Sequence, residues 1–314
     1  MDVSASGYSG TYDGNAHGIT VTAPSGATVK YGTAEGTYNQ TSSPTYTNAG
    51  TYTVYYQVTK DNYTTVTGSQ TVVITKASGS ISYATASVSK TYGDAAFTNA
   101  LTKTGDGTVS YSTSNAGVAA VNATTGKVTL KGNGTATITA TVKDGTNYTY
   151  ATKTATYTVK VGNAAMDVSA SGYSGTYDGN AHGITVTAPS GATVKYGTVE
   201  GTYNQTSSPT YTDAGTYTVY YQVTKDNYTT VTGSQTVIIK KAAGSISYAK
   251  SSVSKTFGDA AFTNALTKTG DGTVSYASSN TSVATVNSTS GKVTLKGNGT
   301  ATITATVKDG TNYT

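Results

Sequence analysis

The sequence predicts an all-β protein made of four β-sandwich domains in tandem, and three observations lead to this prediction. Apolar and polar residues alternate with a period of two over several short segments, which is the pattern of half-buried strands. Clusters of Gly, Asn, Asp and Pro separate these segments, as expected for a sandwich rather than for βαβ units. A long internal repeat divides the 314 residues into similar parts.

The repeat sets the domain boundaries. Residues 1–8 return unchanged at 166–173, and the same offset continues without a gap to the end of the chain. Each copy divides again, because its first half is dense in Tyr and its second half is richer in Ala, Val and Thr. We therefore expect an elongated rod with the order A-B-A-B and modules at 1–77, 78–164, 165–242 and 243–314.

Module A carries the clearest strand pattern. In residues 51–58, one face holds Tyr52, Val54, Tyr56 and Val58, and the other face holds Thr, Tyr and Gln. Further strands are predicted at 18–23, 27–31 and 70–75. Turn-forming residues separate them at 13–15, 24–26 and 61–62.

In residues 150–161 of module B, Thr and Lys alternate with apolar residues, so we expect a final strand there. The chain ends at Thr314, which corresponds to Thr149, so the second B module is predicted to lack this strand. We expect that module to be marginally stable or to receive a strand from elsewhere. We also expect the chain to be a piece of a longer array, with no signal peptide of its own.

The composition argues against several classes of function. There is no Cys, so disulfides, thiolate metal sites and Cys nucleophiles are absent. The net charge is +5, but all 20 basic residues are Lys and they are spread singly. Without Arg the chain lacks the usual bidentate reader of phosphate and guanine, and we expect no nucleic-acid partner. No run approaches the ~18 apolar residues of a membrane helix, so no membrane insertion is expected.

The chain offers no clear catalytic or metal-binding constellation. His17 and His182 each stand in an Asn-Ala-His-Gly segment, without an oriented nucleophile or about three protein ligands for a metal. The acidic residues are scattered, whereas Ca²⁺ takes about six to eight oxygen ligands. We therefore expect no catalytic residues, no cofactor and no metal site.

Three motifs resemble those of known families. Residues 48–54, repeated at 213–219, resemble the tyrosine corner of immunoglobulin-like sandwiches, which implies structural roles for Tyr52 and Tyr217. In module B, residues 114–121 and the Gly-rich strand segments at 126–142 resemble the bacterial Ig-like group 2 domain of intimin-type and other surface adhesins. Module A is similar to the Tyr- and Gly-rich MBG-type repeats of large Gram-positive surface proteins.

These resemblances imply four Ig-like domains in an extracellular protein of the bacterial cell surface. They also leave open a covalent cross-link, because related surface rods often carry Lys–Asn isopeptide or Thr–Gln ester bonds. The residue types for an isopeptide are present in Lys30, Lys60, Lys90, Asn48 and Asn99.

The density of Tyr points to recognition. Each A module has nine Tyr, and surfaces rich in Tyr, Ser, Gly and Asn are what antibody paratopes use. Strand propensity and core packing account for Tyr31, Tyr52 and Tyr56. They account less well for Tyr at turns or on the Thr/Gln face, which we take as candidate binding residues: Tyr38, Tyr46, Tyr55, Tyr63, Tyr203, Tyr211, Tyr220 and Tyr228.

Two functions follow from different readings of these residues. In the first, the chain is a non-enzymatic adhesin whose repeated A modules bind a host glycoprotein and gain avidity from repetition. The resemblance ranks immunoglobulin first, with its variable domains bound in a superantigen-like manner, and mucin glycans second. In the alternative, the chain is an inert stalk that projects a distal domain from the cell wall.

Overall fold

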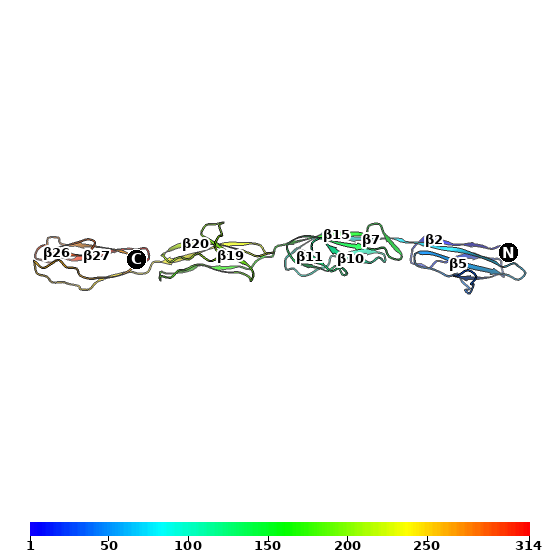
Figure 1. Ribbon diagram of the computed structural model, residues 1–314, viewed down its shortest axis with the longest axis horizontal. Helices are drawn as coiled ribbons and strands as arrows, with labels where there is room; N and C mark the ends of the chain where they lie inside the picture. The colour runs from blue at the N-terminus through cyan, green and yellow to red at the C-terminus, as the bar shows by residue number, and fades with distance from the viewer. The chain divides into compact units, whose positions relative to one another are not determined.

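A computed structural model describes residues 1–314 and contains strands, turns and loops without any helix (Figure 1). The all-β prediction is therefore confirmed. The chain divides into two compact units, Met1–Ala164 and Ala165–Thr314, at the boundary between the two copies of the repeat. No helix long and apolar enough to cross a membrane is present.

The A part of the first unit is built on a four-stranded sheet in the order β2-β6-β5-β4, accompanied by the ribbon β1-β3. The neighbours β4, β5 and β6 are antiparallel, whereas β2 runs parallel to β6. The strands are β1 (Ser4–Ser6), β2 (Tyr8–Thr11), β3 (Thr20–Thr22), β4 (Thr28–Gly32), β5 (Gly50–Thr59) and β6 (Val66–Thr75).

The core of this part lies between the sheet and the ribbon. Val54 of β5 and Val72 of β6 are fully buried, and Ile19, just before β3, packs against them. The alternation predicted in β5 is confirmed, because Val54 and Val58 are buried while Thr51 and Thr53 are exposed. One face of the sheet therefore faces the core and the other faces solvent.

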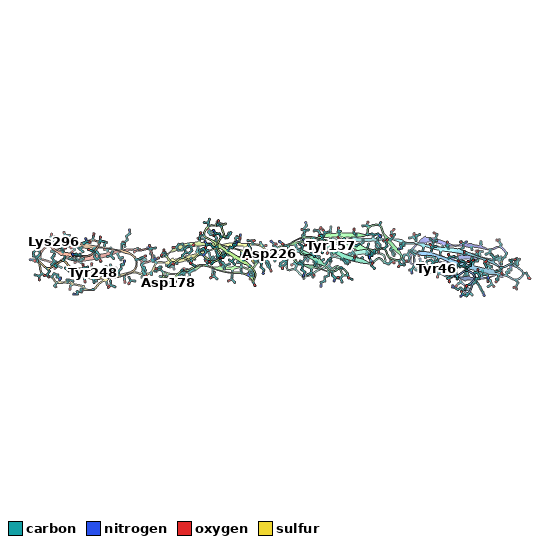
Figure 2. All side chains as sticks on the ribbon, viewed as in Figure 1. Tyr46, Tyr157, Asp178, Asp226, Tyr248 and Lys296 are labelled. Atoms are coloured by element: carbon teal, nitrogen blue, oxygen red, sulfur yellow. The ribbon has the colours of Figure 1, made fainter.

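The B part of the first unit pairs a four-stranded sheet, β10-β13-β15-β8, with a three-stranded sheet, β14-β7-β9, and a ribbon, β11-β12. The largest core cluster includes Tyr157 of β15, which is labelled in Figure 2. Ile138 of β13 and Val128 of the ribbon belong to the same cluster. The strands are β7 (Ala77–Tyr83), β8 (Ser87–Thr91), β9 (Leu101–Thr104), β10 (Val109–Thr113), β11 (Ala119–Val121), β12 (Val128–Leu130), β13 (Gly134–Val142), β14 (Tyr148–Tyr150) and β15 (Thr154–Gly162).

The predicted strand 150–161 is divided in the structure. Tyr150 ends β14 in one sheet, and β15 begins at Thr154 in the other. Tyr150 is buried, and the Gly107 amide donates a hydrogen bond to its hydroxyl at 3.1 Å. This hydrogen bond holds Tyr150 in the three-stranded sheet. Residues 151–153 therefore connect that sheet to the four-stranded sheet, in which β15 begins. An alternation pattern alone does not report such a change of sheet.

The A part of the second unit repeats the first, with the sheet order β17-β21-β20-β19 and the ribbon β16-β18. Its core contains Val219 and Val237, both fully buried. The strands are β16 (Ser169–Ser171), β17 (Tyr173–Thr176), β18 (Thr185–Thr187), β19 (Thr193–Gly197), β20 (Gly215–Thr224) and β21 (Val231–Lys240).

The B part of the second unit has three separate two-stranded pairings, β22-β23, β24-β27 and β25-β26. Its strand β27 pairs with β24 alone, while the equivalent β13 has a neighbour on both sides. The strands are β22 (Ser245–Tyr248), β23 (Leu266–Thr269), β24 (Thr273–Ser278), β25 (Ala284–Val286), β26 (Val293–Leu295) and β27 (Ile303–Lys308).

Candidate binding surface

The sequence-predicted corner tyrosine holds the turn into β5. The Tyr52 hydroxyl donates a hydrogen bond to the Asn48 carbonyl at 3.0 Å, and its ring stacks on that of Tyr46 with centroids 3.9 Å apart. Both rings pack against the core cluster of the A part. In the second unit, Tyr217 and Tyr211 stack at the same 3.9 Å. Tyr46 and Tyr211 therefore contribute to packing, whatever further role their exposed atoms have.

Tyr55 lies on the solvent face of the sheet, opposite to the core-facing Val54 in the alternation of β5. Its cross-strand neighbours are small, with Gly32 on β4 and Ser69 on β6. The surrounding positions of β5 and β6 on this face are mostly Thr, Ser and Gln. Tyr55 is thus a half-buried ring on a polar sheet face.

The loop 33–40 brings a second candidate toward this face. The Tyr31 amide donates to the Gln40 carbonyl at 2.8 Å, which folds the loop back on β4. The Thr37 carbonyl lies directly against the position that a Cβ would take on Gly32, so only glycine admits the loop here. Tyr38 follows Thr37 in this loop and is half-buried. We call Lys30, Gly32, Tyr38, Tyr55 and Gln57 the A-face.

The second unit carries the same arrangement. Gly197 pairs with Tyr220 in the sheet, and the Thr202 carbonyl again fills the place of a Cβ on the glycine. Tyr203 follows Thr202, as Tyr38 follows Thr37. The equivalent A-face consists of Lys195, Gly197, Tyr203, Tyr220 and Gln222.

The remaining candidate lies at another place on the A part. Tyr63 sits in the turn between β5 and β6 and is 54% exposed. The Lys60 ammonium lies 5.3 Å from its ring centroid and also donates to the Ser25 carbonyl at 2.9 Å. In the second unit, the Lys225 ammonium lies 4.9 Å from the half-buried Tyr228 ring. The structure therefore does not place all eight candidate tyrosines on one surface.

His17 belongs to a local network that the sequence analysis did not identify. Its Nε2 lies 2.9 Å from Asp13 Oδ1, and its ring stacks on Tyr8 with centroids 3.7 Å apart. The hydrogen bond from His17 holds the pKa of Asp13 well below its usual range, with further support from the Asn15 amide. In the sequence, the spacing Asp13-x-x-x-His17 is the one signal that could have indicated this contact. No group of three or more His, Cys, Asp or Glu is placed to hold a metal ion.

The A and B parts of the first unit meet in a polar contact that we call the junction clasp. The Asn147 side-chain oxygen accepts a hydrogen bond from the Ala49 amide at 2.8 Å. Its NH₂ group donates to Asn48 Oδ1 at 3.1 Å. The Lys76 ammonium also crosses the junction and donates to the Gly145 carbonyl at 2.7 Å.

The junction clasp recurs in the second unit. Asn312 accepts from the Ala214 amide at 2.7 Å and donates to Asp213 Oδ1 at 3.1 Å. Asp213 stands where the first unit has Asn48, and the geometry is kept because either side chain offers Oδ1 as an acceptor. An edge-to-face contact of Tyr rings, 5.5 Å between centroids, accompanies each clasp: Tyr12 with Tyr148, and Tyr177 with Tyr313.

Four of the five side chains considered for an isopeptide bond have other partners. Asn48 belongs to the junction clasp, and the side-chain NH₂ group of Asn99 donates a hydrogen bond to the Thr85 carbonyl at 3.0 Å. Lys60 reaches the Ser25 carbonyl, and the Lys90 ammonium lies 5.1 Å from the Phe97 ring centroid.

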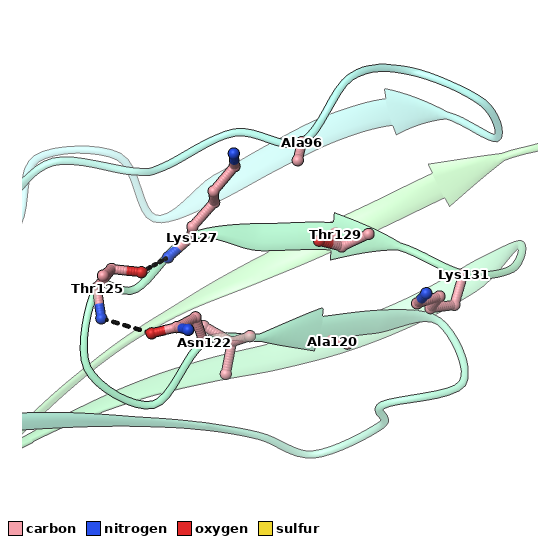
Figure 3. Close-up of a pocket in the computed structure, with 8 residues that line it drawn as sticks. Ala96, Ala120, Asn122, Thr125, Lys127, Thr129 and Lys131 are labelled. Atoms are coloured by element: carbon pink, nitrogen blue, oxygen red, sulfur yellow. Dashed lines mark hydrogen bonds between the residues drawn. The ribbon is translucent and has the colours of Figure 1, made fainter.

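A hollow of about 380 Å³ lies beside the β11-β12 ribbon (Figure 3). The Thr125 amide donates to Asn122 Oδ1 at 2.8 Å, so the polar groups there stabilise the turn between the two strands. The lining includes Lys127 and Lys131 but neither an acidic nor an aromatic side chain. This hollow has none of the convergent groups of a ligand site, and the A-face is the better candidate.

Comparison with known families covers most of the chain. Residues 2–78 and 166–243 match the MBG domain family, and residues 94–146 and 262–311 match the intimin immunoglobulin-like domain family. Both families are repeats of bacterial surface proteins. The residues that match the intimin immunoglobulin-like domain lie within the two B parts. No curated protein sequence matches the chain.

Comparison with solved structures finds cadherin and immunoglobulin domain arrays at low identity and low TM-score. Cadherin domains 3–6 of protocadherin gamma B2 are 12% identical, with a TM-score of 0.31, and cover 93% of this chain and 90% of that one. Domains 1–3 of Drosophila N-cadherin are 11% identical, with a TM-score of 0.34, and cover 76% and 98%. Immunoglobulin domains 1–5 of sidekick-1 are 10% identical, with a TM-score of 0.22, and cover 100% and 79%.

Proposed function

We propose, from the premise that this chain is a tandem array of MBG and intimin-type immunoglobulin-like domains, that it is an adhesion repeat whose A modules bind a host glycoprotein. Such domains typify extracellular bacterial surface proteins that are generally non-enzymatic. The A-face carries the binding, and Tyr55 and Tyr220 are its central residues. The observation that supports this proposal most is the repetition of the same Tyr on a polar sheet face in both units.

The physical argument starts from the burial of Tyr55. A half-buried ring between Gly32 and Ser69 loses little side-chain entropy on binding, because the strand already fixes its position. Tyr presents a large apolar area and a hydroxyl, and the neighbouring Thr, Ser and Gln side chains offer adaptable hydrogen bonds. A polar sheet face of this kind suits a sheet of another β-sandwich, and we therefore rank immunoglobulin variable domains first. Mucin glycans come second, since a sugar ring can stack on the Tyr ring.

Two A-faces on one chain provide avidity. When two weak sites engage a multivalent partner, the second binding event is intramolecular, and apparent affinity rises by roughly 10²–10⁴-fold. A variant with one A-face removed is therefore expected to lose this gain and to keep the weak affinity of a single site. A variant with both removed is expected to lose binding entirely.

The experiment is biolayer interferometry of the immobilised full chain against polyclonal IgA, IgG, Fab fragments and mucin. We expect saturable binding that weakens in Tyr55→Ser and disappears in the double variant with Tyr220→Ser. The matched control is the double variant Tyr63→Ser and Tyr228→Ser, which removes the same side chains from the β5–β6 and β20–β21 turns. Circular dichroism checks that each variant stays folded. Binding to mucin alone, lost after deglycosylation, would identify a glycan adhesin.

The stalk function has its own supporting observation, the junction clasp. Both units hold their A and B parts together through the same hydrogen bonds, which suits a spacer. Absence of binding to every probe at tens of micromolar would leave the stalk as the function of this chain and the Tyr55 ring as packing alone.

A further inference from the structure

Two tyrosines from different parts of each unit meet where the A part joins the B part. In the first unit, the rings of Tyr12 and Tyr148 lie edge to face, with centroids 5.5 Å apart and ring planes at 69°. In the second unit, Tyr177 and Tyr313 repeat this contact with the same distance and angle. We call each pair the junction tyrosines. Their partners lie far apart in the sequence and touch because the two parts of the unit meet.

The backbone holds both residues of the first pair in place. The Tyr12 amide donates a hydrogen bond to the Thr75 carbonyl at 2.8 Å, and Tyr148 pairs with Ala77 in the parallel ladder of β14 and β7. A single residue, Lys76, separates Thr75 from Ala77. The two tyrosines are therefore fixed to neighbouring points of one short segment.

The second pair is held in the same way. The Tyr177 amide donates to the Lys240 carbonyl at 2.8 Å, and Tyr313 forms a parallel bridge with Ala242. Again one residue, Lys241, lies between the two anchoring positions. The contact between the rings is thus a property of the repeating unit.

Each ring of the first pair also packs against the core of its own part. Tyr12 packs against the cluster that contains Val54, and Tyr148 packs against the cluster that contains Ile81. Both tyrosines are half-buried, so part of each stays in contact with solvent. A small oxidant can reach them there, while the packing keeps the two rings together.

We propose that the junction tyrosines are a modification site, at which a dityrosine bond joins the A part to the B part of the same unit. The co-reactant is hydrogen peroxide used by a haem peroxidase, which removes one electron and one proton from each phenol. The two phenoxyl radicals then couple through ring carbons ortho to their hydroxyl groups. The hydrogen on each of these carbons moves to the phenolic oxygen. The chain loses two hydrogen atoms for each carbon–carbon bond, and the peroxide takes them up to become two molecules of water.

The angle between the rings favours this pair over a stacked pair. The new bond lies in the planes of both rings, so the product has two rings twisted about that bond. Ring planes at 69° are compatible with this twist, and the edge of one ring already faces its partner. The rings of Tyr46 and Tyr52 are stacked at 6°, so their edges do not point at each other.

Burial protects another edge-to-face pair, Tyr83 and Tyr157, whose centroids lie 4.7 Å apart. Tyr157 is 2% exposed, and its hydroxyl has no hydrogen-bond partner that could accept the proton lost on oxidation. Burial also raises the pKa of Tyr83, and it raises the pKa of Tyr157 to about 12, because the phenolate is poorly solvated there. Of these pairs, the junction tyrosines are the ones that combine a suitable angle with access from solvent.

The bond would serve this chain as a disulfide serves a chain that contains Cys. It closes a long loop and restricts the unfolded state, which stabilises the folded unit. It also prevents the A and B parts from separating when the hydrogen bonds of the junction clasp open. We therefore expect the oxidised chain to melt at a higher temperature than the untreated chain.

The test treats the dilute full chain with a haem peroxidase and hydrogen peroxide, followed by mass spectrometry of the intact chain and of its tryptic peptides. We expect the monomer to lose two hydrogen atoms per bond and to gain dityrosine fluorescence. Peptide 309–314 contains Tyr313 as its single Tyr and is expected to appear joined to peptide 161–195, which carries Tyr177. Peptides 1–30 and 144–153 are expected to be joined in the same way, with fragmentation locating the bond.

Phenylalanine variants identify the residues that react. Tyr12→Phe keeps the ring but removes the phenol, so it is expected to abolish the first link and to leave the second link as a reference in the same molecule. Tyr63→Phe is the matched control, because it removes a phenol that is 54% exposed and is expected to leave both links unchanged. The double variant Tyr12→Phe and Tyr177→Phe is expected to show no rise in melting temperature after oxidation. Circular dichroism checks that each variant is folded.

Added N-acetyltyrosine, which is consumed in every sample, shows that the oxidant is active. Under that condition, the proposal is wrong for a unit whose linked peptide does not appear. Covalent dimers formed in place of links within the chain would overturn it, as would an equal yield of the first link's mass change in Tyr12→Phe. A linked chain that melts at the temperature of the untreated chain would overturn the stabilising role.

Discussion

The junction clasp leads to the sharpest quantitative prediction. Asn147→Ala removes the acceptor of the Ala49 amide and the donor to Asn48. A typical hydrogen bond contributes about 0.5–1.5 kcal/mol net, so the two together contribute about 1–3 kcal/mol to holding the A and B parts together. If the free energy of the opening that exposes the Ala49 amide falls by about 1–2 kcal/mol, the hydrogen-exchange rate of this amide rises roughly 5- to 30-fold.

Native-state hydrogen exchange measured by NMR reads this change at a single amide. The repeat supplies an internal reference, because the Ala214 amide has the same partner type in Asn312 and stays untouched in the variant. Asn99→Ala is a second control, since it removes a side-chain hydrogen bond within the B part, away from the clasp. Unchanged exchange at Ala49, or equal acceleration at Ala49 and Ala214, would refute the assignment of the clasp.

Three further predictions concern the A parts. Tyr52→Phe removes the hydroxyl that bonds the main-chain carbonyl four residues earlier, and it is expected to lower the free energy of unfolding by about 0.5–1.5 kcal/mol in urea titration, with no change in m-value. Gly32→Ala forces the Thr37 carbonyl to move and is expected to lower the melting temperature, while Gly162→Ala, whose Cβ would meet only the Lys90 carbonyl at 3.8 Å, changes it less. The hydrogen bond from His182 lowers the pKa of Asp178 to about 2, so Asp178 contributes stability above about pH 4 that is lost as the pH falls toward 2. Asp178→Asn should flatten the stability of the A part over that window in acid titration followed by circular dichroism.

Much of the fold was predictable from the sequence because local patterns determine it. The alternation in residues 51–58 and the Gly-rich turns report which side chains face a core, and the structure has β5 where this pattern lies. The division at Tyr150 was not predictable in the same way. It depends on Gly79 and Gly107, which lie far from Tyr150 in the sequence. Because neither has a side chain, they leave room for the buried Tyr150 ring. Periodicity carries no information about which of two sheets a strand joins.

The candidate site was predictable in part. Sequence alternation placed Tyr55 on the solvent face, but it could not show that the loop 33–40 folds back against Gly32, the cross-strand partner of Tyr55. It also could not separate Tyr46, which stacks on the corner tyrosine, from tyrosines with free rings. The junction clasp was missed altogether, because Asn147 reaches residues about a hundred positions earlier in the chain. Such contacts arise only when two domains meet.

The parallel pairing of β2 with β6 has a mechanical consequence. β2 lies near the start of the A part, after β1, and β6 is its last strand, so tension applied along the chain pulls β2 and β6 past each other in opposite directions. The backbone hydrogen bonds between the two strands are loaded in shear and must break together. In a hairpin pulled at its open end, the hydrogen bonds break one after another. β8 and β15 form a similar shear-loaded pair in the first B part.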